Sequence, residues 1–231
     1  MPGVEIPKAM QPFQFYTRVS LRELTGLKAK NLQELLSHIQ TVPDSVIYHH
    51  THHFLQEHQC LSPEPPNDFA YWIKAVLNES ALAERLASIN TCEFSTIQAL
   101  RNKISSTIEN FLQNSKGALR EANDDESLHF IKSVSVVFPT PYRVITLEEF
   151  AEVLKKITMH SIYFHVFEAK LRLAKGANDF SVWLEASLDE KELARKIEKL
   201  DPYTFTMEGL RNKILGFVEN RIGERGLEWK P

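Results

Sequence analysis

Two stretches of the chain alternate apolar and polar side chains or are rich in β-branched residues, and each precedes a segment with helical periodicity. Residues 13–20 read Phe-Gln-Phe-Tyr-Thr-Arg-Val-Ser, and residues 128–138 contain several valines and an isoleucine. Both patterns favour short strands. Because a lone strand leaves its backbone groups unpaired, we expect the two stretches to pair with each other as a two-stranded ribbon.

The segments that follow carry apolar residues three and four positions apart, as the buried face of a helix does. Asn31 and Thr146 stand where an N-cap would begin the first helix of each segment. Pro43 opens a second helix that we expect to run to about His58, and Asn67-Asp68 begins a third. The apolar positions of the two first helices are Leu32, Leu35, Leu36 and Ile39, and Leu147, Phe150 and Leu154.

An internal repeat relates the two halves of the chain. His50 aligns with His165 at an offset of 165 − 50 = 115, which also aligns Phe15 with Phe130. Further along, residues 67–69 recur at an offset of 111 as Asn-Asp-Phe, and Leu-Arg-Asn-Lys-Ile at 100–104 recurs at an offset of 110. Matching blocks in the same order predict a tandem duplication.

The predicted fold class is mainly α. It is a tandem duplication of a five-helix unit, each copy preceded by a short β-strand, packed with pseudo-twofold symmetry so that two small units share a buried face. The predicted division is an N-terminal arm at 1–12, a first helical repeat at 13–113, a linker at 114–127, a second helical repeat at 128–223 and a C-terminal tail at 224–231.

Four blocks of the sequence resemble an uncharacterised prokaryotic family of duplicated helical proteins, known only as a domain of unknown function. The blocks are Ile-Tyr-His-His at 47–50, Pro-Asn-Asp-Phe-Ala-Tyr-Trp at 66–72, Ser-Val-Ser-Val-Val-Phe-Pro-Thr at 133–140 and His-Ser-Ile-Tyr-Phe-His-Val-Phe-Glu-Ala at 160–169. The resemblance covers nearly the whole chain and implies an intracellular prokaryotic protein. It implies no activity.

Composition narrows the classes of partner. The formal charge of −3 and the pI near 6.3 argue against general binding to nucleic acid or to an anionic membrane. Cys60 and Cys92 show no pairing pattern, and residues 1–8 contain no signal segment, so we expect a cytoplasmic protein. The remaining partners are an unknown protein or a small molecule.

The histidines of the second helix carry the candidate metal chemistry. His50 and His53 share one helical face, and the second copy places His165 and Glu168 at the same spacing. If the two helices converge, these four residues would form an N/O ligand set suited to a zinc, iron or manganese ion.

A structural role explains the same residues. His50 and His165 lie at the edge of an apolar face and would hydrogen-bond a backbone carbonyl, Glu168 would pair with Arg172, and His49 and His52 would point outward. Tyr48 and Tyr163 are shared by both copies. Their hydroxyl groups would either take part in acid–base chemistry beside a histidine or be buried and hydrogen-bonded in the core.

Polar residues elsewhere in the repeat also have two readings. The Asn-Asp pairs at 67–68 and 178–179 are typical of N-caps, with a carboxylate in a cleft as the alternative. Trp72 and Trp183 are expected in the core, with ligand stacking as the alternative. Arg101 and Arg211 would bind an anionic ligand or form salt bridges to a neighbouring helix.

No nucleotide-binding loop, nucleophile elbow or His-Glu-x-x-His pattern is present in the sequence. We therefore expect a non-enzymatic binding or scaffold protein. One alternative is a metal-dependent oxidoreductase or hydrolase. The other is a small-molecule binder whose ligand lies between the repeats, in an apolar pocket lined by Tyr48, His50, Tyr163 and His165, with Arg101 or Arg211 binding an anionic group. Because the second helices diverged most, we also expect both to face a common cleft, with His50 and His165 within about 10 Å of each other.

Overall fold

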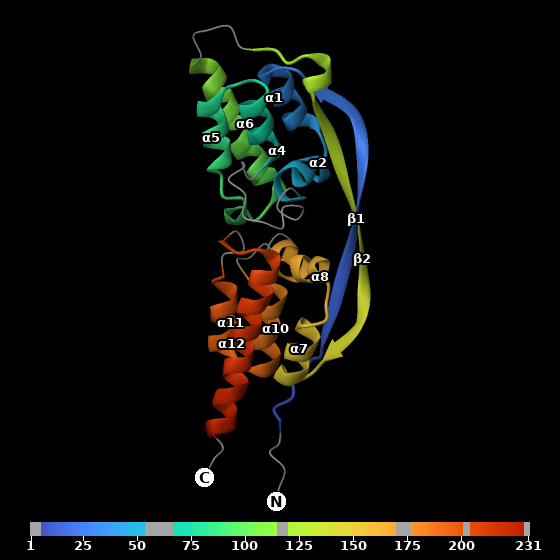
Figure 1. Cartoon of the computed structure of the whole chain (residues 1–231), viewed down its shortest axis with the longest axis vertical. Coiled ribbons are helices and arrows are strands. Elements are labelled where there is room, and N and C mark those ends of the chain that lie inside the picture. Colours follow the sequence, from blue (N-terminus) through green and yellow to red (C-terminus); the bar gives the residue numbers. More distant parts are fainter. Residues whose placement is uncertain (1–5, 54–66, 115–119, 170–176, 201–203, 229–231) are drawn as a thin grey trace, which may run out of the picture. The chain divides into compact units, whose positions relative to one another are not determined.

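The structure of the protein is a computed structural model that describes residues 6–53, 67–114, 120–169, 177–200 and 204–228 (Figure 1). Contacts divide the chain into two compact units. The central unit is Ser20–Ser135, and the terminal unit is Met1–Val19 together with Val136–Pro231.

Strands β1 (Phe13–Ala29) and β2 (Leu128–Val144) form a two-stranded sheet and run in opposite directions in Figure 1. Two side-chain bonds show the register: the Thr140 hydroxyl donates to the Phe15 carbonyl at 2.9 Å, and the Thr25 hydroxyl donates to the Phe130 carbonyl at 2.8 Å. The predicted pairing of the two stretches is therefore present in the structure.

The predicted fold class is wrong: the protein is α+β and not mainly α. Each strand is 17 residues long instead of short, because the pairing continues through residues 21–24 and 135–139. These residues are exposed, so no core imposes an alternating pattern on them. The sequence predicts the first strand only to residue 20 and the second only to residue 138. The duplication and the pseudo-twofold packing stay predictions.

The helices begin where local capping chemistry places them. The side chains of Asn31, Thr146, Asn67 and Asn178 each accept the amide of the residue three positions on. The central unit contains α1 (Leu32–Thr41), α2 (Asp44–Tyr48), α4 (Asp68–Ala75), α5 (Ser80–Ala87) and α6 (Ile97–Asn114). The terminal unit contains α7 (Leu147–Leu154), α8 (Met159–Tyr163), α10 (Asp179–Leu188), α11 (Lys191–Glu198) and α12 (Met207–Glu228).

Each unit has its own hydrophobic core, and each core includes part of a strand that precedes the other set of helices. Phe130 of β2 is fully buried among the helices of the central unit. Phe13 and Phe15 of β1 are buried among the helices of the terminal unit. The units therefore exchange strand segments: the start of β1 packs on the helices that follow β2, and the start of β2 packs on the helices that follow β1.

Segments predicted as an arm and a linker also pack against the units. The Trp183 indole donates to the Gln11 carbonyl, and the Trp72 indole donates to the Glu126 carbonyl, both at 2.8 Å. Ala122, inside the predicted linker, is buried. Both tryptophans are nearly buried, in agreement with a core role. Among the described residues, no helix is both long and apolar enough to cross a membrane.

Candidate functional site

A π-helix follows the second helix of each unit, at His49–His53 and at Phe164–Glu168. Single π turns are rare and occur often at functional sites. They also widen the helix, so side-chain positions no longer follow a period of 3.6. The expectation that His49 and His52 point outward is wrong for this reason, and both are only 5% exposed. The later part of the predicted second helix, from residue 54, lies outside the described residues.

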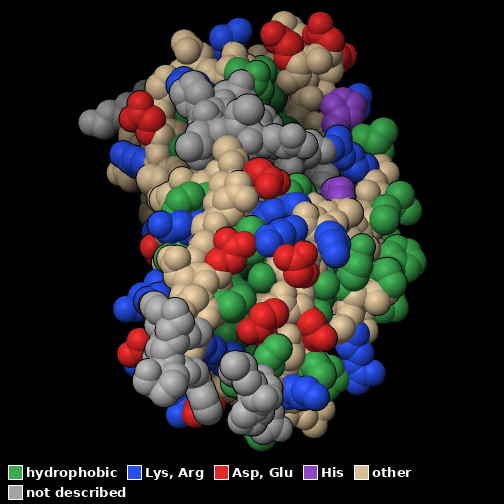
Figure 2. Space-filling model, turned by 60° about the horizontal axis from the view of Figure 1, so that its bottom comes forward, with side chains coloured by type: hydrophobic (Ala, Val, Ile, Leu, Met, Phe, Trp, Pro, Cys, Tyr) green, Lys and Arg blue, Asp and Glu red, His purple; other side chains and the backbone are tan. Residues whose placement is uncertain are grey.

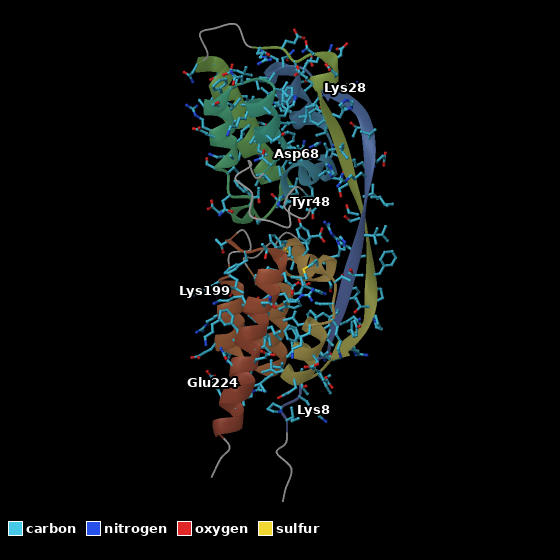
Figure 3. The ribbon with its side chains drawn as sticks, in the orientation of Figure 1. Lys8, Lys28, Tyr48, Asp68, Lys199 and Glu224 are labelled. Carbon is cyan, nitrogen blue, oxygen red and sulfur yellow. The ribbon has the colours of Figure 1, made fainter. Side chains whose placement is uncertain are left out.

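His50 in the central unit uses both ring nitrogens. Its Nδ1 lies 2.8 Å from the Asp68 carboxylate, and its Nε2 accepts the Ile131 backbone amide at 3.0 Å. A nitrogen that accepts a hydrogen bond carries no proton. The ring is therefore neutral, with its proton on Nδ1 and shared with Asp68. Figure 3 labels Asp68 at the start of α4, close to the helix that bears Tyr48.

His165 in the terminal unit has the same arrangement. Its Nδ1 lies 2.7 Å from the Asp179 carboxylate, and its Nε2 accepts the Tyr16 backbone amide at 2.8 Å. The ring is only 2% exposed and lies among aromatic side chains, with Phe13 and Phe164 at centroid distances of 5.0 Å. We call each set of strand amide, histidine and aspartate a histidine clamp.

Each histidine clamp joins three elements: the π-helix, the first residue of the third helix and a strand. The neutral ring is held in one tautomer by an amide on one side and a carboxylate on the other. At His50 the partners are a carboxylate and a backbone amide, so the predicted hydrogen bond to a backbone carbonyl is wrong there. The arrangement satisfies the hydrogen-bonding need of a backbone amide. A metal ion bound to either ring nitrogen would have to displace one of these hydrogen bonds.

The four predicted metal ligands fall in different surroundings. His50 and His165 belong to different units, so their convergence in one cleft stays a prediction. The His53 side chain and Arg172 lie outside what the structure describes. Glu168 forms an ion pair with the buried Arg18 of β1. A different group gathers in the central unit, where His49, His50 and Asp68 have ligand atoms within 4.8 Å of one another.

The predicted ligand-binding residues make contacts within single units. Tyr48 is half-buried and stacks on His52, and Tyr163 is buried and stacks on Phe167, with the Arg18 guanidinium 4.8 Å from its ring centroid. Figure 3 labels Tyr48 on the helix preceding the first π turn. A ligand role for either tyrosine stays a prediction.

Arg101 and Arg211 each hydrogen-bond to the part of the chain that connects the first and second helices of their unit. Arg101 donates to the Ile39 carbonyl at 2.5 Å and to the Asp44 carboxylate at 2.6 Å. Arg211 donates to the carbonyls of Lys155 and Ile157 at 3.2 and 2.8 Å. The ion pair with Asp44 agrees with the salt-bridge alternative, and the carbonyl contacts explain why an arginine fork suits both positions.

A groove opens beside the histidine clamp of the terminal unit, between the start of β1, the π-helix and α10. Its volume is about 610 Å³, within the range of small-molecule sites. Most of its surface is apolar, and Asp179 and Gln14 supply polar groups. The lining residues are Phe13, Gln14, Tyr16, Val137, Phe164, His165, Asp179, Val182, Trp183, Ala186 and Ser187.

Exposed apolar side chains continue from this groove along the strands. Tyr16, Val19, Val136, Val137 and Phe138 of the terminal unit are 37–51% exposed. Figure 2 shows hydrophobic side chains gathered on the side of the molecule where the strands lie, at the right of the view. Large contiguous apolar surface of this kind is typical of interaction sites.

Asp68 and Asp179 belong to the site, whereas the sequence predicted them as parts of N-caps. The asparagine before each aspartate is the cap, as predicted, while the aspartate itself binds the histidine. One sequence signal pointed to this pairing: both halves contain a histidine followed later by an Asn-Asp pair at a helix start. That the histidine and the aspartate are in contact is seen only in the folded structure.

Fold and site together define an α+β protein in which two helical units are each fastened to a shared strand pair by a histidine clamp. The chain belongs to a family of unknown function, DUF5752, whose sequence model matches residues 10–219. The resemblance noted from the sequence is thereby confirmed. A solved structure, that of OrfY from Thermoproteus tenax, is similar, with a TM-score of 0.78 and 27% sequence identity over 94% of this chain and 98% of that chain. No curated protein matches.

Proposed function

We propose that this protein is a non-enzymatic binding protein and that the groove of the terminal unit is its binding site. The observation that carries the proposal is the apolar, aromatic-walled groove of about 610 Å³ beside His165. Binding sites for small molecules are concave and mostly apolar, with a few polar groups that orient the ligand. The groove has this composition.

Exposed apolar surface supports the same proposal. Among the described residues, eight of the twelve exposed large hydrophobic side chains lie on the two strands. Isolated exposed apolar residues need no explanation, but such a concentration on one element does. Two of them in the terminal unit, Tyr16 and Val137, line the groove, so a ligand or partner that enters it would contact them.

The histidine clamp gives the groove a fixed wall. His165 is held at both nitrogens, so the π-helix and the start of β1 keep their positions on either side of it. A wall that is already ordered lowers the entropic cost of binding. The clamp therefore acts by positioning, and it does not require the histidine to take up or release a proton.

The test uses a neutral, apolar fluorescent dye, prodan, and two matched variants. Val182 lines the groove and is 42% exposed, while Tyr71, the corresponding residue of the central unit, is 48% exposed. We expect Val182→Asp to weaken dye binding about tenfold, because a carboxylate must lose water when the dye enters, and tenfold corresponds to about 1.4 kcal/mol. Tyr71→Asp should leave the affinity unchanged. Equal affinity of Val182→Asp and the wild type would contradict the proposal.

A metal-dependent function is the second candidate, and the cluster of His49, His50 and Asp68 favours it. Two imidazoles and a carboxylate are suitable ligands for zinc or another transition metal. The corresponding cluster of the terminal unit has Phe164 in place of His49, so a His49→Phe variant is a natural control. Elemental analysis of protein purified without a histidine tag should find about one metal ion per chain, lost in His49→Phe. Less than about a tenth of an equivalent after reconstitution would exclude this candidate.

A further inference from the structure

The middle of the strand pair buries polar side chains and exposes apolar ones. Antiparallel sheets usually do the reverse, with an apolar face on the core and a polar face in water. Here Arg18 and Ser133 are only 1% and 7% exposed, and the Ser133 hydroxyl lies 2.6 Å from that of Ser20. Val19 and Val136 are 51% and 43% exposed. Exposed apolar surface together with buried polar groups is the pattern that calls for an explanation.

The register of the strands gathers the exposed apolar residues on one face. Three contacts follow the same antiparallel register: Thr140 with Phe15, Lys132 with Glu23, and Thr25 with Phe130. This register places Val19 opposite Val136. Because alternate residues of a strand point to the same face, Leu21 and Phe138 share the face of this pair, and they are 58% and 46% exposed. We call Val19, Leu21, Val136 and Phe138 the apolar face. None of the four lines the groove.

No residue of the apolar face is charged. At one end of it, Glu23 and Lys132 form an ion pair across the strands at 3.3 Å. At the offset of 115 that aligns the two strands, Phe138 corresponds to Glu23 and Lys132 corresponds to Thr17, so the other end has a ring and a hydroxyl instead of an ion pair. Charged side chains usually keep exposed strands from associating. Nucleic acid or an anionic membrane would require cations on this face.

We infer that the apolar face is the contact surface of a dimer, in which it packs against the same face of a second copy of this chain. In a twofold interface each surface meets its own copy, so a face of one charge would repel itself and an uncharged face does not. Two sheets that pack face to face bury their apolar sides against each other. The inference concerns a surface separate from the groove and does not depend on the proposed binding function.

The size of the apolar face sets the expected strength of the dimer. Its four side chains are about half exposed and offer on the order of 350 Å² of apolar surface. A standard interface buries about 800 Å² on each partner, and smaller ones belong to weak, reversible complexes. We therefore expect a dissociation constant on the order of 10 µM.

Sedimentation velocity of the full-length protein measures this association. One chain has a mass of 26.6 kDa. We expect the weight-average mass to rise toward twice that value between about 1 and about 200 µM protein. About 1 M sodium chloride should not lower it, because salt screens ion pairs and leaves apolar contacts in place. The mass of a single chain over the whole range would overturn the inference and leave the face for a different protein.

Two neighbouring valines provide matched variants. Val136 belongs to the apolar face, while Val137 is 45% exposed and points to the opposite face of the strand pair. Val136→Lys should raise the dissociation constant at least about tenfold, because the ammonium group must lose water in the interface. Val137→Lys should change it by less than about twofold. The two variants place the same side chain at similarly exposed positions of one strand, so any effect on folding is shared.

Val19→Lys repeats the test on the other strand and should also raise the dissociation constant at least about tenfold. Near-ultraviolet circular dichroism shows that each variant is folded, and Val19→Lys decides the result if Val136→Lys is not. If Val137→Lys separates the dimer as strongly as Val136→Lys, or if the two apolar-face variants associate like the wild type, the contact lies on another surface and the inference is overturned. None of these outcomes depends on dye binding in the groove.

Discussion

At the scale of single residues, a buried histidine joins the strand to the helices in each unit, because both of its ring nitrogens are hydrogen-bonded. His50 and His165 have the same partners, an aspartate on Nδ1 and a strand amide on Nε2. Their immediate neighbours differ: His49 lies edge-on to His50 at 5.1 Å, and Phe164 lies edge-on to His165 at 5.0 Å. The positioning role is thus common to both units, while the chemistry around it is specific to each.

Replacing His165 by phenylalanine tests the clamp. The ring shape is roughly kept, but the Tyr16 amide and the Asp179 carboxylate lose their hydrogen bonds to the imidazole. Leaving a buried donor unsatisfied costs about 1–3 kcal/mol, so we expect a loss of about 2 kcal/mol in the free energy of unfolding. Denaturant titration measures this loss, and hydrogen exchange of the Tyr16 amide should accelerate at least about tenfold.

The control for this substitution is His129→Gln, since His129 is exposed on β2. Its effect should stay within about 0.5 kcal/mol. If the Tyr16 amide of His165→Phe exchanged at the wild-type rate, the hydrogen bond to Nε2 would have no part in holding the strand.

At the scale of elements, caps and π turns decide which side chains reach the site. Asn67 and Asn178 begin α4 and α10, and this places the aspartate that follows each of them opposite a histidine. The π turns then rotate the residues around each histidine away from their expected faces. A helical wheel therefore groups His50 with His53, whereas the folded helix groups His50 with His49 and Asp68.

Asn178→Ala tests the start of α10. The Asn178 side chain accepts the Ser181 amide at 2.9 Å, and the Asn178 amide donates to the Ser181 hydroxyl in return. Because Asn178 is 1% exposed, we expect a loss of about 1–2 kcal/mol in thermal or denaturant unfolding. Asn178→Asp should lose less, since aspartate also caps. The exposed Asn220→Ala in α12 should change stability by less than about 0.5 kcal/mol, and a similar effect at both sites would argue against the cap.

At the scale of the whole molecule, the two strands connect the units through exchanged segments. Residues 13–19 of β1 belong to the terminal unit and residues 128–135 of β2 to the central unit. Each set of helices thus takes a core phenylalanine and a clamped backbone amide from the other half of the chain. Neither half contains all the groups that its own core requires.

Division of the chain within residues 115–119 tests this dependence. The fragment 120–231 would lack Phe13, Phe15 and the Tyr16 amide, so we expect it to lose fixed tertiary packing when expressed alone. Co-expression with the fragment 1–114 should restore a one-to-one complex with the near-ultraviolet circular dichroism of the intact chain. A dispersed amide NMR spectrum from the isolated fragment 120–231 as a monomer would contradict the expectation.

Local chemistry was readable from the sequence alone. The helix starts at Asn31, Asn67, Thr146 and Asn178 follow from side chains that bond amides three residues away, and the repeated blocks predicted matching elements. The family resemblance came from contiguous residues and is confirmed. These features depend on groups that are close in sequence, so a linear pattern suffices to find them.

Only the tertiary structure decided the length of the strands, the partners of the histidines and the place of the groove. The exposed middle of each strand does not pack on a core, so its residues need not alternate between apolar and polar. A π turn moves side chains away from the positions that a period of 3.6 residues predicts. His165 meets an amide 149 residues away, and the groove joins side chains from β1, the π-helix and α10. Contacts between distant residues depend on how whole elements pack, and that packing is set by the sum of many small interactions rather than by any one motif.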